Sequence, residues 1–465
     1  MRSIRHVVAP VAAILTLLGC SPTDGAVLPT RPPSAGAAGI GDRDFPLDGN
    51  GGYDVTHYGI TLGYTPAAKR LDGVTTIRAR ALQPLSRFNL DLSGLQVAEV
   101  SVDGAGAAFS RQGDELTVVP ATPLASGARF TVKVGYGGEP RPITDSGNLG
   151  TFGFIPTADG AFVAAEPNGA KTWFPANDHP ADKATFDFEI TVPRGLTALA
   201  NGEPVGEPTT SGGRTTFRWR ERHPMATYLA TATLGRFELR EGRTAGGVPN
   251  VAAVDPAYRD SLDKLYTVSG EVTDHWSEVF GPYPFASTGG VVDDYSAGYA
   301  LETQTKPMYG GFSPDESIIA HEIAHQWFGN SVTIQRWQDL WLNEGFATYA
   351  EWLWSEHRGR TTADAHFAAL HARPASDAFW TYPPGRARPD DLFNDAVYKR
   401  GAMTLHALRK EIGDRTFFAL LREWVQRHRH GNATTQQFVT LAEQRSGKRL
   451  DALFDAWLFQ PRRPA

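Results

Sequence analysis

The sequence predicts two structural units, an N-terminal antiparallel β domain followed by an α-rich domain, and two observations carry this prediction. The chain has 465 residues, of which 41% are hydrophobic and 21% charged, and this length and composition are typical of two or three packed units. The spacing of apolar residues then changes from every second residue to a helical period near residue 241. We therefore expect a β-rich domain over residues 46–240 and an α-rich domain with a small sheet over residues 241–465.

Alternating apolar residues support the β domain. The segment FDFEITV places every second residue from Phe186 to Val192 on one apolar face, and FTVKVGY does the same from Phe130 to Tyr136. Asp-Gly pairs at Asp72 and Asp103 are turn signals between such runs. Short strands joined by tight turns are typical of antiparallel sheets.

Helical periodicity dominates the second half of the chain, as in residues 261–280 and 317–328. The start of the second of these helices has its own signal. Ser313 is a candidate N-cap, Pro314 suits the first helical position, and Glu316 is placed for a capping box. This start predicts which side chains share each face of the helix.

The N-terminal segment MRSIRHVVAPVAAILTLLGC resembles a bacterial lipoprotein export signal. It has a basic start and an apolar run that ends at Cys20. The resemblance implies that residues 1–20 are the lipoprotein signal and that Cys20 carries the lipid. An ordinary cleaved signal with a coincidental cysteine is the alternative. Residues 21–45 are rich in proline, glycine, alanine and serine, which predicts a flexible spacer.

These features predict an exported protein that is lipid-anchored at the extracellular or periplasmic face of the cell envelope. We expect contact with the membrane only through Cys20, which is the only cysteine, so no intramolecular disulfide can form. The net charge of −6 and the short RHRH run at residues 427–430 provide no basic surface for nucleic acid, so we expect no such partner. The oligomeric state is not indicated.

The segment HEIAHQWFGN, which begins at His321, predicts a metal site. His321 and His325 are one helical turn apart, so both imidazoles can reach one ion. Catalytic zinc usually has a third protein ligand, and Glu344 lies in the next apolar segment, which can return antiparallel to the first. We expect these three residues to bind one zinc ion per chain. A polar helix face without a metal is the alternative.

Glu322 follows the first histidine and has a different predicted role. It cannot share the helix face of both histidines, but it lies beside them, where it can take a proton from a water molecule that zinc makes more acidic. We therefore predict that Glu322 is the general base.

The two segments HEIAHQWFGN and NEGFATY together resemble the aminopeptidase N type of gluzincin zinc metallopeptidases, a family that includes leukotriene hydrolase. The resemblance runs from about Tyr53 to the C-terminus. It implies a β-rich N-terminal domain, a thermolysin-like catalytic domain, and an enzyme that removes N-terminal residues from peptides with a free N-terminus.

Two segments that resemble substrate-binding motifs of this family imply further site residues. The motif G-A-M-E-N corresponds to residues 299–303, which implies that Glu302 binds the substrate α-amine and that Ala300 also contacts substrate. The Q-x-E-P element corresponds to residues 164–167, which implies a second amine-binding carboxylate at Glu166. Alanine replaces the glutamine of that element here, so we expect an altered pocket for the first side chain.

The segment VYKRGAM resembles the part of the family that presents a tyrosine hydroxyl to the tetrahedral intermediate, which implies this role for Tyr398. Asp339 is a candidate either for orienting a metal-bound imidazole or for capping the following helix.

Larger relatives carry a C-terminal helical domain that begins about where this chain ends, so we expect an open cleft that admits longer peptides.

Three other functions are compatible with the same residues. An endopeptidase or an epoxide hydrolase could use the same scaffold, and a surface binding module could retain the scaffold without activity. Peptides with a blocked N-terminus distinguish an aminopeptidase from an endopeptidase or an epoxide hydrolase. Turnover of any aminoacyl substrate distinguishes an enzyme from a binding module.

Overall fold

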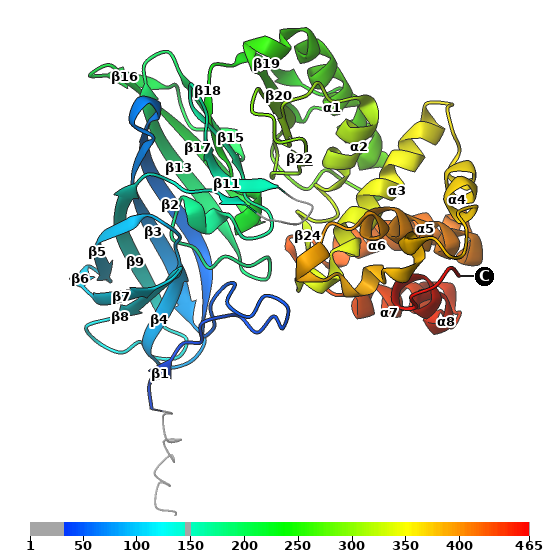
Figure 1. Ribbon diagram of the computed structural model, residues 1–465, viewed down its shortest axis with the longest axis horizontal. Coiled ribbons are helices and arrows are strands. Elements are labelled where there is room, and N and C mark those ends of the chain that lie inside the picture. Colours follow the sequence, from blue (N-terminus) through cyan, green and yellow to red (C-terminus); the bar gives the residue numbers. More distant parts are fainter. Residues whose placement is uncertain (1–31, 145–149, 465) are drawn as a thin grey trace, which may run out of the picture. The chain divides into compact units, whose positions relative to one another are not determined.

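The computed structural model describes residues 32–144 and 150–464, and its body is one compact unit that begins at Pro33. The chain first forms β sheets and then helices around a smaller sheet, which confirms the predicted order of a β-rich and an α-rich part (Figure 1). Cys20 and residues 1–20 lie outside the described residues, so the lipoprotein signal stays a prediction. No helix within residues 32–144 and 150–464 has both the length and the apolar character needed to cross a membrane.

The largest sheet has nine strands in the order β15-β17-β13-β2-β3-β9-β5-β6, with β16 beside β17. Its strands are β2 (Tyr53–Thr65), β3 (Arg70–Ala81), β5 (Gln96–Val102), β6 (Ala105–Gly106), β9 (Arg129–Gly138), β13 (Lys183–Pro193), β15 (Glu203–Pro204), β16 (Thr209–Ser211) and β17 (Arg214–Ala226). All neighbours are antiparallel except β2 and β13, which pair in parallel. Along β13 the apolar residues from Phe186 to Val192 are buried and the polar ones between them are partly exposed, as alternation predicts.

Two smaller sheets complete the β-rich part. One has the order β1-β4-β8-β7 and the other the order β10-β11-β12-β18-β14. Their strands are β1 (Ser34–Ala35), β4 (Leu85–Asp91), β7 (Ala108–Gln112), β8 (Glu115–Val119), β10 (Ile143–Thr144), β11 (Thr151–Pro156), β12 (Ala161–Ala164), β14 (Thr197–Ala200) and β18 (Ala232–Gly235). The second of these sheets matters for the site, because β12 leads directly to Glu166.

The α-rich part contains the expected small sheet, with the order β19-β20-β21-β23-β22, and a separate pair, β24 and β25. These strands are β19 (Glu238–Arg243), β20 (Pro249–Val254), β21 (Thr288–Asp293), β22 (Ala300–Leu301), β23 (Met308–Gly310), β24 (Val332–Ile334) and β25 (Gly431–Ala433). The helices are α1 (Leu262–Phe280), α2 (Glu316–Ala324), α3 (Trp341–His357), α4 (Ala363–His371), α5 (Asp395–Ile412), α6 (Asp414–Arg427), α7 (Thr435–Ser446) and α8 (Asp451–Phe454). The change in the spacing of apolar residues, which the sequence shows near residue 241, falls within β19, the first strand of this small sheet.

The described end of the predicted spacer packs on the body, which corrects the expectation of a flexible segment for these residues. Strand β1 pairs in parallel with β4. Asp42 is buried, where its carboxylate accepts a hydrogen bond from the backbone N–H of Trp337 (3.2 Å) and lies 3.2 Å from Nε2 of His179. Composition did not reveal this, because the contacts that hold the segment are made with residues far away in the sequence.

The start of α2 differs from the prediction by two residues. Asp315 is the N-cap, and its side chain accepts hydrogen bonds from the backbone N–H groups of Ser317 and Ile318. An aspartate at this position satisfies free N–H groups and also interacts favourably with the positive end of the helix dipole. It therefore replaces Ser313 as the cap, and Pro314 precedes the helix.

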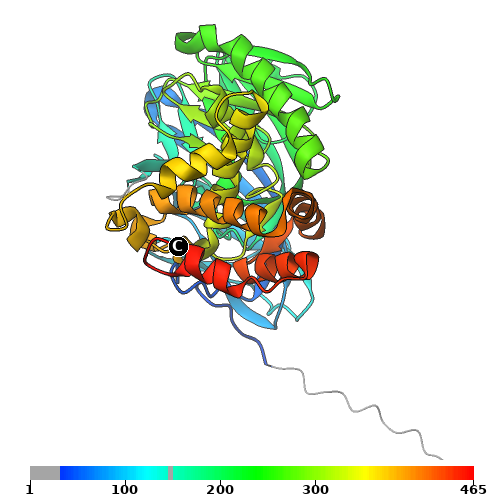
Figure 2. The same cartoon turned by 90° about the vertical axis from the view of Figure 1, so that its right-hand side faces the viewer.

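Helices α3 and α5 lie side by side (Figure 2), and two glycines form a close contact between them. A Cβ atom on Gly401 would lie 2.8 Å from Cα of Gly345, and one on Gly345 would lie 2.9 Å from backbone atoms of Gly401. Real Cβ atoms do not approach backbone this closely, so the helices can cross at this distance only without side chains there. Glu344 and Tyr398 lie next to this contact, on α3 and α5.

We predict that Gly401→Ala lowers the free energy of unfolding by about 2 kcal/mol, because the added methyl group forces α3 and α5 apart. Urea denaturation monitored by tryptophan fluorescence measures this change. Gly270→Ala is the matched control within helix α1, since its Cβ would first meet the amide nitrogen of the Asn250 side chain at 3.3 Å. We expect a change of less than about 1 kcal/mol there, where helix propensity favours alanine. Equal stability of both variants would contradict the packing argument.

Candidate metal and peptide site

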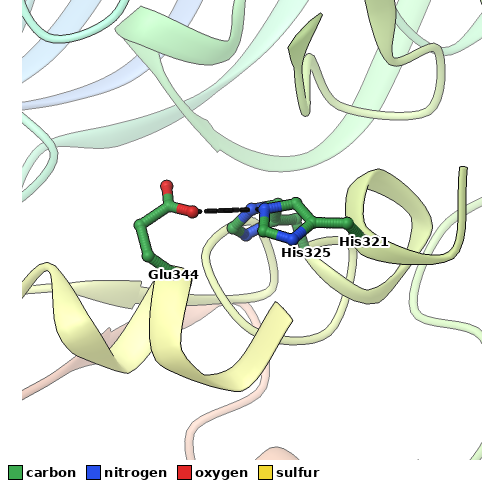
Figure 3. A group of neighbouring side chains, drawn as sticks. All are labelled: His321, His325 and Glu344. Atoms are coloured by element: carbon green, nitrogen blue, oxygen red, sulfur yellow. Dashed lines mark hydrogen bonds and ion pairs between the residues drawn. The ribbon is translucent and has the colours of Figure 1, made fainter. Parts of the chain in front are cut away.

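The three predicted metal ligands come together as expected. His321 is on α2, and His325 is the first residue after the end of this helix. Glu344 on α3 points toward both histidines (Figure 3). The Nε2 atoms of His321 and His325 lie 3.2 and 3.4 Å from Oε2 of Glu344. One ligand atom from each residue lies within 4.8 Å of the other two, and all three side chains are buried. Two nitrogens and one oxygen at this spacing match the donor set of a catalytic zinc site.

Contacts behind the histidines orient their rings. Nδ1 of His321 lies 2.7 Å from Oε1 of Glu351, whose other oxygen accepts a hydrogen bond from the Ser317 hydroxyl. Nδ1 of His325 lies 3.0 Å from the carbonyl oxygen of Phe328. When the Nδ1 atom of each histidine carries the proton and donates a hydrogen bond to these oxygens, its Nε2 atom keeps a lone pair for a metal.

Asp339 does not take part in this orientation. Its carboxylate accepts hydrogen bonds from the hydroxyl and the backbone N–H of Thr435 at the start of α7. Glu351, which contacts His321 instead, was not predicted from the sequence. It lies seven residues after Glu344 on α3, so two helical turns place both carboxylates on one face.

Four carboxylates gather around the two imidazoles. Glu166, Glu302, Glu322 and Glu344 are all buried, and oxygens of Glu166, Glu302 and Glu344 lie within 4.8 Å of one another. Burial raises the pKa of Glu322 to about 8, and burial together with the neighbouring carboxylates raises that of Glu166 well above its usual range. Burial also opposes ionisation of Glu344, but the neighbouring imidazoles outweigh it and lower its pKa to about 2.

This charge distribution fits a bound metal ion. A buried carboxylate is stable only with a proton or a positive partner, and Oε1 of Glu166 is buried without a hydrogen-bond partner in the described structure. A divalent ion between His321, His325 and Glu344 would compensate part of the negative charge. Of the three carboxylates that are not ligands, Glu166 and Glu302 have oxygens close enough to each other to attract a second positive group together.

The backbone around Glu302 is held by side chains that follow α2. Gln326 and Asn330 donate hydrogen bonds to the carbonyl oxygen of Glu302, at 3.2 and 2.7 Å. The Tyr228 hydroxyl donates to its carboxylate at 3.3 Å. Tyr228 belongs to the β-rich part of the chain, and no local pattern in the sequence distinguished it from a core tyrosine. Its contact shows that both halves of the chain position Glu302.

The remaining predicted site residues line one cavity of about 470 Å³ beside the metal ligands. They are Glu166, Ala300, Glu302, Glu322 and Tyr398. The ring of Tyr398 lies 6.2 Å from that of His321, between centroids. Burial and the nearby carboxylates raise the pKa of Tyr398 well above its usual range, so its hydroxyl stays protonated and can donate a hydrogen bond. Phe393 also lines the cavity and was not predicted.

Comparison with known proteins agrees with this geometry. The Peptidase M1 N-terminal domain matches residues 54–229, and the Peptidase family M1 domain matches residues 313–457. The crystal structure of an M1 zinc metallopeptidase from Deinococcus radiodurans is 30% identical and covers 92% of this chain and 99% of its own, with a TM-score of 0.81. The chain belongs to peptidase family M1. Because the solved relatives are zinc metallopeptidases, the cofactor of this M1 peptidase is one zinc ion, which fits the cluster of two histidines and a glutamate.

Longer relatives of this M1 peptidase resemble it over part of their length. Aminopeptidase M1 of Arabidopsis thaliana is 30% identical over 326 residues, which are 64% of this chain and 37% of the plant protein. Aminopeptidase N of Lactococcus lactis is 30% identical over 63% of this chain and 38% of its own length. The chain therefore spans less than half the length of these two relatives.

We predict that Glu351→Gln weakens zinc binding about tenfold, because the amide no longer holds the His321 imidazole with a full negative charge. Competition with a chromogenic chelator, followed by metal analysis, measures the affinity. Glu356→Gln is the control, since Glu356 lies on the same helix but contacts Ala363 and Arg409 instead of a metal-binding histidine. A zinc affinity unchanged in Glu351→Gln would show that this contact does not support the ligand.

Proposed function

We propose that this M1 peptidase is a zinc aminopeptidase that removes N-terminal residues from peptides. The observation that carries the proposal is the pair of buried carboxylates, Glu166 and Glu302, with oxygens within 4.8 Å of each other beside the metal ligands. A protonated α-amine is a small cation with three donors, so it suits two adjacent carboxylates. Binding of the amine there places the first peptide bond, and no later one, next to the metal.

The printed names of the relatives support the same activity. Several are aminopeptidases, and a variant of the Deinococcus radiodurans enzyme has been solved with a Tyr-Ser-Ala substrate bound. Zinc held by His321, His325 and Glu344 would supply Lewis acidity, which polarises the scissile carbonyl and makes a water molecule more acidic.

Two side chains of the cavity are placed for proton transfer and for stabilisation of the transition state. Glu322 is buried next to His321, where it accepts the proton of the attacking water and returns it to the leaving amine. Tyr398 donates its phenolic hydrogen to the oxygen that becomes negative during attack. Both groups act on the bond that the amine-binding pair selects.

We predict that N-acetylation of a peptide lowers kcat/KM by at least about a hundredfold, because the neutral amide cannot replace an ammonium group between Glu166 and Glu302. Hydrolysis of a free and an N-acetylated form of one tripeptide, followed by mass spectrometry, measures the loss. Equal cleavage of both forms would favour an endopeptidase, and absence of cleavage of any peptide would favour a binding module or a hydrolase of another bond.

We predict that Glu322→Gln lowers kcat by about a hundredfold to ten-thousandfold and leaves the zinc content at one ion per chain, because the amide cannot accept a proton and does not belong to the ligand set. An aminoacyl 4-nitroanilide assay and metal analysis on the same sample separate the two effects. Full activity of this variant would remove Glu322 from the role of general base.

We also infer that the chain is exported and lipid-anchored at the cell envelope through Cys20. The basic start and the apolar run before this cysteine support the inference. Cys20→Ser should abolish incorporation of radiolabelled palmitate in a bacterial host and release the protein from the membrane fraction. Labelling that persists in the serine variant would refute the anchor, and the parent chain is the control for expression.

A further inference from the structure

A second cavity, of about 500 Å³, adjoins the metal site on one side. It shares Ser317, Glu351 and Tyr398 with the first cavity, so the two cavities adjoin at these residues. The amine-binding carboxylates Glu166 and Glu302 line only the first cavity. The second cavity is therefore the neighbouring space that could take the downstream part of a substrate whose amine lies between those carboxylates.

The second cavity carries two permanent cations. Arg360 follows α3, and Lys399 is the residue after Tyr398 on α5. Each contacts one carboxylate: Nη2 of Arg360 lies 3.0 Å from Glu316, and Nζ of Lys399 lies 2.5 Å from Asp395. Their side chains are 57% and 42% exposed, so both can turn, and each has more donor hydrogens than one carboxylate uses.

Other groups of this cavity suit a peptide backbone and its side chains. Trp352 and Leu370 form apolar walls. Thr348 also lines the cavity, and its hydroxyl is buried without a hydrogen-bond partner in the described structure. His366 stacks on Trp352, and burial lowers its pKa, so the ring is neutral at neutral pH. The positive charge of the cavity therefore comes from the arginine and the lysine, and its negative charge comes from Glu351 and Asp395, which line it as well.

We propose that the second cavity binds the downstream end of short peptides and that Arg360 and Lys399 bind its C-terminal carboxylate. This inference rests on the proposed aminopeptidase function, because it takes the amine end of the substrate to lie in the first cavity. A cavity of 500 Å³ is about 8 Å across, which an extended chain crosses in about two residues. The favoured substrates are dipeptides and tripeptides with a free carboxylate, rather than the longer peptides that an open cleft admits.

A comparison of free and amidated peptides tests the proposal on the unmodified enzyme. For one tripeptide sequence we expect KM to be about tenfold lower for the free acid than for the C-terminal amide, with about threefold from each partly exposed cation. The advantage of the free acid should decline when the peptide is extended to five residues, because its carboxylate then lies beyond the two cations. Equal KM values for the acid and the amide would overturn the proposal.

Three variants assign the effect to these residues. Arg360→Ala and Lys399→Ala should each reduce the ratio of the two KM values to about threefold. Arg358→Ala is the matched control, since Arg358 contacts the same oxygen of Glu316 as Arg360 does but does not line the cavity. It should leave the ratio unchanged. A tenfold ratio that persists in both cavity variants would also overturn the proposal.

Two further measurements show the reason when a carboxylate preference is missing. The first tests whether a variant has misfolded, and the second tests whether the proposed aminopeptidase function is itself wrong. Arg360→Lys keeps the charge and should retain most of the preference, which a variant that merely misfolds would not do. An aminoacyl 4-nitroanilide has no carboxylate on its leaving group. If the unmodified enzyme cleaves this substrate but does not distinguish acid from amide, only the carboxylate inference fails. If it cleaves neither peptide nor anilide, the proposed function itself is wrong.

Discussion

Negative charge buried around two imidazoles is the constraint on which the site depends. Glu166, Glu302, Glu322 and Glu344 are almost completely buried, and an unpaired carboxylate in such a place costs several kcal/mol. Protons can relieve this cost, as the raised pKa of Glu322 indicates. Positive partners relieve it better, because they leave the carboxylates ionised. The site is therefore suited to two cations, a metal ion at the histidines and, as we propose, an ammonium group next to it.

Such an arrangement requires rigid support, and both halves of the chain supply it. The glycine contact between α3 and α5 holds the helices that carry Glu344 and Tyr398 close together. Nζ of Lys183, on β13, donates to the carbonyl oxygens of Asn330 and Ser331 in the loop after α2. The two Lys183 hydrogen bonds join the β-rich and α-rich parts, so the β-rich part acts as a positioning element as well as a source of Glu166.

The loop that follows Glu302 is held in the same way. The backbone N–H of Gly202 donates to the hydroxyl of Thr305, and Nζ of Lys306 donates to the carbonyl oxygen of Gly202. Burial lowers the pKa of Lys306 to about 8, which shows how far this contact lies from solvent. A carboxylate that must meet a substrate amine within hydrogen-bond distance benefits from a backbone that cannot move, because misplacement weakens every charge-assisted contact.

The sequence by itself determined the features that depend on local spacing. Two histidines four residues apart share a helix face in any α-helix, and alternating apolar residues bury one face of any strand, so the metal ligands and the β-rich half could be inferred without coordinates. The roles of Glu302, Glu166 and Tyr398 came from resemblance to family motifs.

Tertiary structure alone decided how distant segments meet. It placed Glu351 behind His321, put Tyr228 on Glu302, moved the helix cap to Asp315, packed Asp42 against the body and opened a second cavity beside the first. Each of these depends on which helix face meets which loop, and such contacts between remote residues leave no periodic signal in the chain.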